Sequence, residues 1–310
     1  MTPRIEVHGL GKRFGDRVAV EGLSFAVRPG EVFGLLGPNG AGKTTTVRML
    51  TGLLRPSSGS ARVCGHGVGG QGDGQALRRS VGLLTEQPGL YDRLTARENL
   101  VFFMKLNELD EAQAWSRARG YLRRFGLAGR EDEPCGSYSK GMRQKLAIIR
   151  ALVHDPEVLF LDEPTSGLDP EAARTVRDAV AELAVEGRTI VLCSHNLAEV
   201  ERLCGRVAVV RTTLLAEGPI SVLRRRGRVL EVRVEGEGER AGAALSAVTG
   251  VSWTAHGPLL RVTLADEHQA PEVVAALVQA GARVWSVTPS ERSLEDVYLE
   301  LVRDEPAEAA

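Results

Sequence analysis

The sequence predicts an α/β fold whose core is a mostly parallel β-sheet with helices on both faces. Two short apolar runs, residues 158–161 and 189–193, have the length and aliphatic composition of buried strands. A stretch with strong helical spacing, residues 171–186, separates them. Strands that alternate with helices of this length are typical of parallel sheets, because a parallel connection has to cross one face of the sheet. A third buried strand, residues 32–36, runs into a glycine-rich loop and a further helix.

Three other regions surround this predicted core. Residues 4–33 contain strand-like segments broken by turns, which predicts an antiparallel β-subdomain at the N-terminus. Residues from about 88 to 156 are rich in helical patterns and predict an inserted helical subdomain. We expect the large domain to cover residues 1–222, a small α+β domain to cover 223–303, and a flexible tail to follow at 304–310.

The composition limits the class of protein. A chain of 310 residues with 43% hydrophobic and 25% charged residues can bury a sizeable core, which argues against disorder. The formal net charge of -1 argues against a nucleic-acid partner, because binding along a phosphate backbone needs an excess of basic residues. The four cysteines are scattered and form no C-x-x-C pair, so neither a zinc knuckle nor a redox motif is indicated.

The sequence also carries hints about the cellular location. The N-terminal segment MTPRIEVHGLGKRF lacks the apolar core of a secretory signal, and the scattered thiols fit a reducing cytoplasm. No run approaches the ~18 apolar residues of a spanning helix, so any membrane role is expected to come from a partner. Only five of the 39 basic residues are lysine, a bias that indicates a GC-rich bacterial genome.

A phosphate-binding loop is predicted at residues 37–44. These residues match G-x-x-x-x-G-K-[ST] and lie between a predicted strand and a predicted helix, which is the setting that the motif requires. Glycines let backbone N–H groups approach phosphate oxygens, and the N-terminus of the helix favours the same anion. We expect Lys43 to reach the β- and γ-phosphates of ATP, Thr44 to ligate Mg²⁺, and Thr45 to lie on the α-phosphate side. The full set is Gly37, Pro38, Asn39, Gly40, Ala41, Gly42, Lys43, Thr44 and Thr45.

Two carboxylates follow the apolar run 158–161. Asp162 is expected at the Mg²⁺ ion, which prefers hard oxygen ligands. Glu163 is expected to be the general base that orients water in line with the γ-phosphate. Open α/β sheets bind ligands at the carboxyl ends of their strands. His195 follows another such strand, so we expect it to contact the γ-phosphate; a structural or surface role is the alternative.

Residues 138–144, YSKGMRQ, narrow the choice of family. They resemble the signature sequence LSGGQ of the ABC ATPases, and the whole resemblance covers about residues 4–215 in order. It implies a P-loop NTPase (RecA-like) fold for the large domain, the cofactors ATP and Mg²⁺, and a homodimer. In that dimer, Ser139 and Gly141 would contact the γ-phosphate held by the opposite subunit.

The signature has its own departures from the family pattern. Lys140 replaces a glycine and Met142 replaces the glutamine, and both are taken as nucleotide-binding positions by their place in the motif. Helical spacing after the motif predicts a helix over residues 144–153.

The same resemblance assigns roles outside the signature. Phe14 is expected to stack on adenine, with a place in the core of an N-terminal strand as the alternative. Asp169, in the segment SGLD, is expected to reach across the dimer. Glu86 falls where the family has its Q-loop glutamine, and Gln87 stands one place later. Either of these two could ligate Mg²⁺ or sense the γ-phosphate, and the sequence leaves the choice open.

The signature and the segment at residues 293–298, SLEDVY, resemble ATPase subunits of bacterial drug- and antibiotic-resistance exporters. The resemblance implies an ATP-hydrolysing subunit at the cytoplasmic face of the membrane, paired with a separate multi-span permease. The helical insertion would contact that permease. Candidate contact residues, which could equally be core, are Val101, Phe102, Phe103 and Met104.

The sequence also bears on two other functional classes. A soluble ABC ATPase of translation or DNA repair is disfavoured, because such proteins usually carry two ATPase domains, long coiled coils or zinc modules. A regulatory or resistance protein that sequesters a drug or signals without transport is an alternative that the sequence leaves open.

Overall fold

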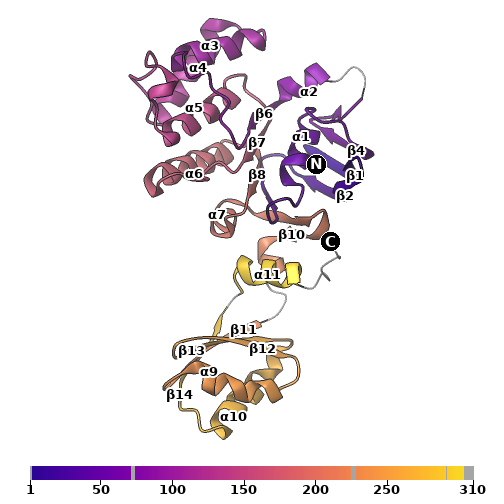
Figure 1. The fold of residues 1–310 in the computed structure, drawn as a ribbon, viewed down its shortest axis with the longest axis vertical. Coiled ribbons are helices and arrows are strands. Elements are labelled where there is room, and N and C mark those ends of the chain that lie inside the picture. Colours follow the sequence, from indigo (N-terminus) through magenta and orange to yellow (C-terminus); the bar gives the residue numbers. More distant parts are fainter. Residues whose placement is uncertain (1, 71–73, 225–227, 291, 304–310) are drawn as a thin grey trace. The chain divides into compact units, whose positions relative to one another are not determined.

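The computed structural model describes residues 2–70, 74–224, 228–290 and 292–303 (Figure 1). The chain divides between Gly218 and Pro219 into two compact units, which are described separately below. The tail predicted at 304–310 lies outside the described residues. Over the described ranges, no helix combines the length and the apolar character needed to cross a membrane.

The larger unit is built on a six-stranded sheet with the strand order β10-β9-β3-β8-β7-β6. The pairs β6–β7, β7–β8, β8–β3 and β3–β9 are parallel. Every residue of β3, β7 and β8 is buried, as expected for a parallel sheet covered on both faces. The strands are β3 (Val32–Leu36), β6 (Val81–Leu84), β7 (Val158–Asp162), β8 (Thr189–Ser194), β9 (Arg206–Arg211) and β10 (Thr213–Pro219).

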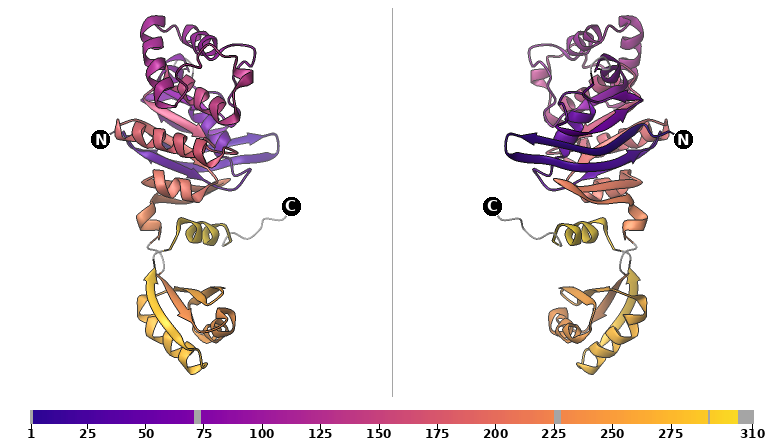
Figure 2. Two further views of the ribbon diagram at one scale, coloured as in Figure 1. Left: turned by 90° about the vertical axis from the view of Figure 1, so that its left-hand side faces the viewer. Right: turned by 90° about the vertical axis from the view of Figure 1, so that its right-hand side faces the viewer.

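An antiparallel sheet of four strands packs on this core, in the order β2-β1-β4-β5. Its inward side chains form one continuous apolar core with β3 and β7, and the ring of Phe25 stacks on that of Phe33 at 5.4 Å. The two views in Figure 2 show these strands on one side of the parallel sheet and helix α6 (Pro170–Val185) on the other. The strands are β1 (Ile5–Phe14), β2 (Arg17–Val27), β4 (Ser58–Val63) and β5 (His66–Gly67).

The helices that join these strands place the candidate site. Helix α1 (Lys43–Leu50) follows β3, and α7 (Leu197–Leu203) follows β8. Between β6 and β7, the helices α3, α4 and α5 pack on one another and gather at the top of Figure 1. The remaining helices of this unit are α2 (Gly74–Ser80), α3 (Ala96–Leu106), α4 (Glu111–Arg124), the 3-10 turn η1 (Cys135–Ser137) and α5 (Lys140–Leu152).

Helix α5 begins four residues earlier than the sequence predicts, at Lys140 rather than Gln144. The reason is a cap, because the hydroxyl of Ser139 accepts a hydrogen bond from the backbone N–H of Met142 at 3.2 Å. The signature residues therefore form the N-terminus of the helix instead of a loop ahead of it.

The smaller unit has an antiparallel sheet in the order β12-β13-β11-β14. One face of this sheet packs against α9, η2 and α10 around a core of valines and leucines. The strands are β11 (Arg228–Val234), β12 (Val251–His256), β13 (Leu259–Leu264) and β14 (Val284–Ser290). The helices are α8 (Ile220–Arg224), α9 (Gly238–Gly242), η2 (Ala243–Ala247), η3 (Glu267–Gln269), α10 (Ala270–Gln279) and α11 (Leu294–Arg303).

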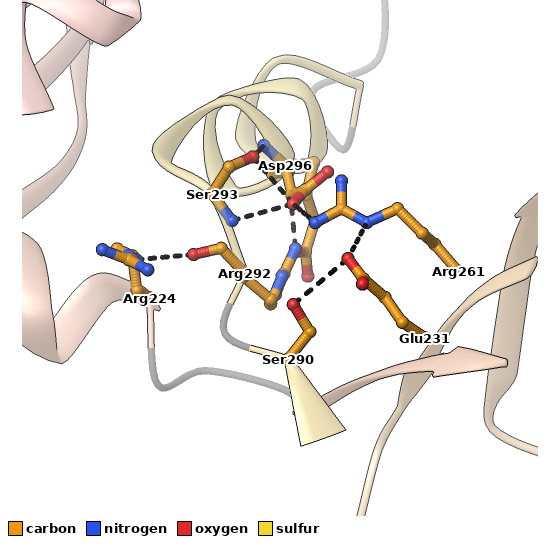
Figure 3. A network of polar contacts seen from close by, with 8 residues as sticks. Arg224, Glu231, Arg261, Ser290, Arg292, Ser293 and Asp296 are labelled. Carbon is orange, nitrogen blue, oxygen red and sulfur yellow. Dashed lines mark hydrogen bonds and ion pairs between the residues drawn. The ribbon is translucent and has the colours of Figure 1, made fainter. Parts of the chain in front are cut away.

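A polar network ties the last helix, α11, to the rest of the smaller unit (Figure 3). The guanidinium of Arg261 on β13 pairs with Glu231 at 3.6 Å and with Asp296 of α11 at 3.5 Å. The Nε atom of Arg224, in α8, donates to the backbone carbonyl of Arg292 at 2.6 Å. Helices α8 and α11 also contact each other. The first and last helices of the unit are therefore joined.

Candidate nucleotide-binding site

The loop between β3 and α1 is shaped by glycines that no other residue could replace without a shift. A Cβ atom on Gly37 would lie 2.3 Å from the carbonyl oxygen of Val210, far inside van der Waals contact. Gly42 has φ 93°, in the region that favours glycine, and a Cβ there would lie 2.5 Å from the carbonyl oxygen of Ala19. The backbone can therefore fold into a tight cradle immediately before the N-terminus of α1.

Lys43 is largely buried beside this cradle, with 7% of its surface exposed. Its ammonium donates to the carbonyl oxygens of Gly37 at 2.6 Å and Pro38 at 3.0 Å. These bonds hold a positive charge against the loop, where an incoming triphosphate would meet it together with the backbone N–H groups.

Thr44 and Asp162 form the oxygen-rich side of the site. The Thr44 hydroxyl donates to the carboxylate of Asp162 at 2.8 Å, which joins α1 to the end of β7. Burial raises the pKa of Asp162, and the hydrogen bond from Thr44 opposes that shift. Among the described residues, no cluster of three His, Cys, Asp or Glu side chains could hold a metal alone. One hydroxyl and one carboxylate fit Mg²⁺, which usually takes few protein ligands and completes its shell with phosphates and water.

Glu163 and His195 meet at the ends of two adjacent strands. One carboxylate oxygen of Glu163 lies 2.8 Å from Nδ1 of His195, and the other accepts from the His195 backbone N–H at 3.0 Å. Glu163 has φ 51°, an uncommon backbone conformation for a residue with a Cβ. Its own N–H donates to the carbonyl of Cys193 on β8 at 2.9 Å. The side chain is thus held in one orientation from both ends.

A buried carboxylate that the sequence did not single out lies behind this pair. Glu199, on α7, accepts hydrogen bonds from the hydroxyls of Thr165 and Ser194, both at 3.0 Å. Burial raises the pKa of Glu199, and the two hydrogen bonds oppose the shift.

The phosphate loop, Asp162, Glu163 and His195 line one pocket of about 450 Å³. Its lining contains most of the predicted residues together with three that were not predicted, Arg17, Ala19 and Ser166. Glu86 lines the pocket, whereas Gln87 is exposed next to it and uses its backbone carbonyl to accept from the Thr85 hydroxyl. The predicted residues that line it are Phe14, Asn39, Gly40, Ala41, Gly42, Lys43, Thr44, Thr45, Glu86, Asp162, Glu163 and His195.

Phe14 presents its ring at the mouth of this pocket. Half of the residue's surface is exposed, and the ammonium of Lys12 lies 5.2 Å from the ring centroid. A core position is therefore wrong for Phe14, and an open aromatic face beside a phosphate cradle can accept a stacked base.

The signature residues are not part of this pocket. Ser139 and Lys140 are exposed at the start of α5, where Ser139 caps the helix and Gly141 and Met142 form its first turn. The ammonium of Lys140 lies against Gly167 in the segment SGLD. Asp169 caps the next helix, α6, because its carboxylate accepts from the Ala172 N–H at 2.8 Å.

Two family models match the chain. Residues 20–166 match the family described as ABC transporter, and residues 218–302 match the one described as ATP-binding protein DrrA1-3-like, C-terminal domain. A daunorubicin resistance ATP-binding protein of Streptomyces coeruleorubidus is 39% identical over 97% of this chain and 96% of that protein. The chain belongs to the ABC transporter ATP-binding proteins.

Other comparisons agree with this membership. A Nod factor export ATP-binding protein I of Ralstonia nicotianae is 42% identical over 67% of this chain and 64% of that protein. A solved structure of the ATP binding subunit of an ABC transporter matches with a TM-score of 0.66 and 33% identity, covering 72% of this chain and 92% of that one. The predicted fold and family are confirmed. As an ABC ATPase, the protein binds ATP and hydrolyses it to power transport.

Proposed function

We propose that this ABC ATPase works as a homodimer that closes on two ATP molecules and drives a separate membrane permease. The supporting observation is that the phosphate-binding pocket and the signature residues lie at separate places on the chain. The pocket holds the phosphate loop, the carboxylates and His195, while Ser139 and Gly141 lie outside it at the start of α5. A second copy of the chain can bring its own Ser139 to the open side of the pocket.

The chain's own residues account for the binding of the nucleotide. Lys43 and the N–H groups of the loop bind the β- and γ-phosphates, and Phe14 stacks on the adenine. Thr44 and Asp162 would hold Mg²⁺, with Glu86 or Gln87 completing the site from the loop after β6. When bound, Mg²⁺ supplies charge neutralisation on the phosphate oxygens as the terminal bond breaks.

Hydrolysis then depends on Glu163 and His195. The Glu163 carboxylate accepts a proton from the attacking water and holds that water in line with the γ-phosphate. His195 orients Glu163 by its two contacts and donates toward the γ-phosphate from the neighbouring strand. Asp169 and the signature residues Ser139 to Met142 belong to the face that meets the second copy. Loss of the γ-phosphate removes their shared anion, so the dimer reopens.

Substitution of Ser139 by arginine should prevent ATP-driven dimerisation without loss of ATP binding. The bulky side chain would occupy the space meant for the partner's γ-phosphate, whereas the chain's own cradle is elsewhere. Light scattering should give twice the monomer mass for the native chain with Mg²⁺ and a non-hydrolysable ATP analogue, and the monomer mass for the variant.

The matched control is Ser139→Thr, which keeps the hydroxyl that caps α5. This variant should dimerise like the native chain, and both variants should bind the analogue. A native chain that binds the analogue yet keeps the mass of a monomer would contradict the homodimer.

A second pocket, of about 570 Å³, is the proposed docking groove for the permease. Two leucines are exposed on it, Leu53 by 59% and Leu106 by 68%. The groove and the nucleotide pocket are linked by consecutive residues, because Thr85 lines the first and Glu86 the second. The groove is lined by Thr51, Leu53, Gln75, Arg78, Arg79, Val81, Leu83, Thr85, Phe103, Leu106, Asn107, Glu108, Arg150 and His154.

The candidate contact residues of α3 divide between this groove and the core. Phe103 lines the groove, and Phe102 is exposed and packs edge-on against Tyr91 with ring centroids 5.4 Å apart. Met104 is fully buried, so it belongs to the core of the helical region.

Leu106→Glu should release the permease while the ATPase activity of the free chain stays unchanged. A carboxylate in an apolar contact has to lose its hydration, which costs more than the contact returns. Co-purification of the full chain with its permease from detergent-solubilised membranes measures this. Val185→Glu is the control, because it adds the same charge at a residue that is 90% exposed and lines neither pocket. Equal recovery of permease with both variants would rule out this groove.

The transported compounds are proposed to be drugs, antibiotics or other hydrophobic molecules moved outward. The relative named for daunorubicin resistance supports this, because it matches nearly the whole chain and both units. We further propose that the protein is bacterial and lies at the cytoplasmic face of the membrane, held there by its permease and without a nucleic-acid partner.

A further inference from the structure

We propose that Glu199 is a positioning residue for ATP hydrolysis, which fixes the Glu163–His195 pair by tying together the two loops that carry it. This inference rests on the proposed roles of Glu163 and His195. Glu199 touches neither of them through a hydrogen bond, so it would act through their backbones.

The first tie reaches the loop after β7. The hydroxyl of Thr165, two residues beyond Glu163, donates to the Oε2 atom of Glu199 at 3.0 Å. The same loop turns tightly, since the Ser166 N–H donates to the carbonyl of Glu163 at 3.2 Å. A displacement of Thr165 would therefore be passed directly to the backbone of Glu163.

The second tie reaches the loop after β8. The hydroxyl of Ser194, the residue before His195, donates to the same Oε2 atom at 3.0 Å. That hydroxyl also accepts from the Asn196 N–H at 3.0 Å, while the Asn196 side chain caps α7 by accepting from the Glu199 N–H at 3.2 Å. His195 is thus enclosed between two residues that both depend on Glu199.

The burial of this carboxylate makes an ordinary helix-surface role a poor explanation. Glu199 is only 3% exposed, and its Oε1 atom has no hydrogen-bond partner among the described residues. Burying an acidic group with one unsatisfied oxygen is costly. If the position needed only apolar packing, an aliphatic residue like the neighbouring buried Val200 would provide it without that cost. What Glu199 supplies is one acceptor oxygen shared by two hydroxyl donors, Thr165 in the loop after β7 and Ser194 at the end of β8.

If Glu199 has this positioning role, its removal should lower kcat and leave KM for ATP nearly unchanged. Nucleotide binding uses the cradle and Lys43, which Glu199 does not contact, so KM for ATP should stay close to the native value. The alignment of base and water uses the Glu163–His195 pair, and misplacement by about 1 Å can cost ~100-fold in kcat.

The test compares Glu199→Ala, Glu199→Gln and Arg202→Ala in the full chain, with MgATP as the substrate. Glu199→Ala should lower kcat by about 100-fold with little change in KM. Glu199→Gln keeps an acceptor oxygen for both hydroxyls and should retain most of the native kcat. Arg202→Ala alters an exposed side chain on the same helix and should behave like the native chain. If Glu199→Ala does not fold, Thr165→Val combined with Ser194→Ala removes the same two bonds, together with the one from the Asn196 N–H, and should lower kcat at least as much.

A double variant separates positioning from general stability. Because Glu199 acts by placing the base, Glu199→Ala should cost little more once Glu163→Gln has removed that base. Three results would each overturn the inference. The first is a kcat in the double variant that falls by the product of the two single losses. The others are an unchanged kcat in Glu199→Ala and a Glu199→Gln as slow as Glu199→Ala. If Glu163→Gln itself turns over normally, the proposed function fails instead, which distinguishes the two errors.

Discussion

Glu163→Gln should lower the turnover of ATP by about 10²- to 10⁴-fold, since it removes the proposed general base. Glutamine has nearly the same shape but cannot accept a proton from water. Its amide can still contact His195, so the local geometry should survive. Steady-state release of phosphate measures turnover, and equilibrium binding of a fluorescent ATP analogue measures affinity, which should stay close to native.

The same variant should accumulate as an ATP-bound dimer, because the signal that reopens the dimer is the loss of the γ-phosphate. Glu171→Gln is a matched control on the first turn of α6, where the carboxylate does not line the pocket. Native turnover in Glu163→Gln would exclude Glu163 as the base and leave the carboxylate with a structural role only.

Lys43→Ala should instead weaken the binding of ATP itself, by about 100-fold for the loss of a charge-assisted contact from a largely buried ammonium. The ammonium is the only buried lysine charge in the described part of the pocket lining. Its removal also takes away the donor that the carbonyl oxygens of Gly37 and Pro38 share. Titration calorimetry with ATP in Mg²⁺ buffer reports the affinity directly.

Lys105→Ala serves as the control for this second experiment. That lysine is exposed on α3 and pairs with Glu111 at 3.8 Å, away from the nucleotide pocket. The control should bind ATP like the native chain. Equal affinity in Lys43→Ala would mean that the loop binds phosphate through its backbone alone.

The elements that can be predicted from the sequence are those whose signal is local. The apolar runs that became β3, β7 and β8 are buried at every residue, so their composition alone indicates strands of a covered sheet. Strand β12 was not predicted, although its half-buried residues Val251, Trp253 and Ala255 alternate with exposed polar ones, which is the pattern of a half-buried strand. The early start of α5 was also missed, since Gly141 is a weak helix former and the cap at Ser139 decides the boundary.

In the candidate site, too, only residues with a local sequence signal could be predicted. The phosphate loop and the two carboxylates belong to patterns with fixed spacing, so they could be found in one sequence. Glu199 could not, because its partner Thr165 is 34 residues away and neither residue type suggests the other. Arg17 and Ala19 enter the pocket only because β1 and β2 pair in a long hairpin that faces the cradle. Glu86 lines the pocket and Gln87 does not, a difference that the sequence alone could not give because the two residues are consecutive.

The hydrogen bond from Arg224 to Arg292 has a consequence for the history of the smaller unit. It joins the first helix of that unit, α8, to the residues just before its last described helix, α11. A compact unit whose first and last helices hold each other can be gained, lost or exchanged as a whole while the rest of the polypeptide keeps its fold. Relatives with the same motor could thereby acquire different appendages without redesign of the motor.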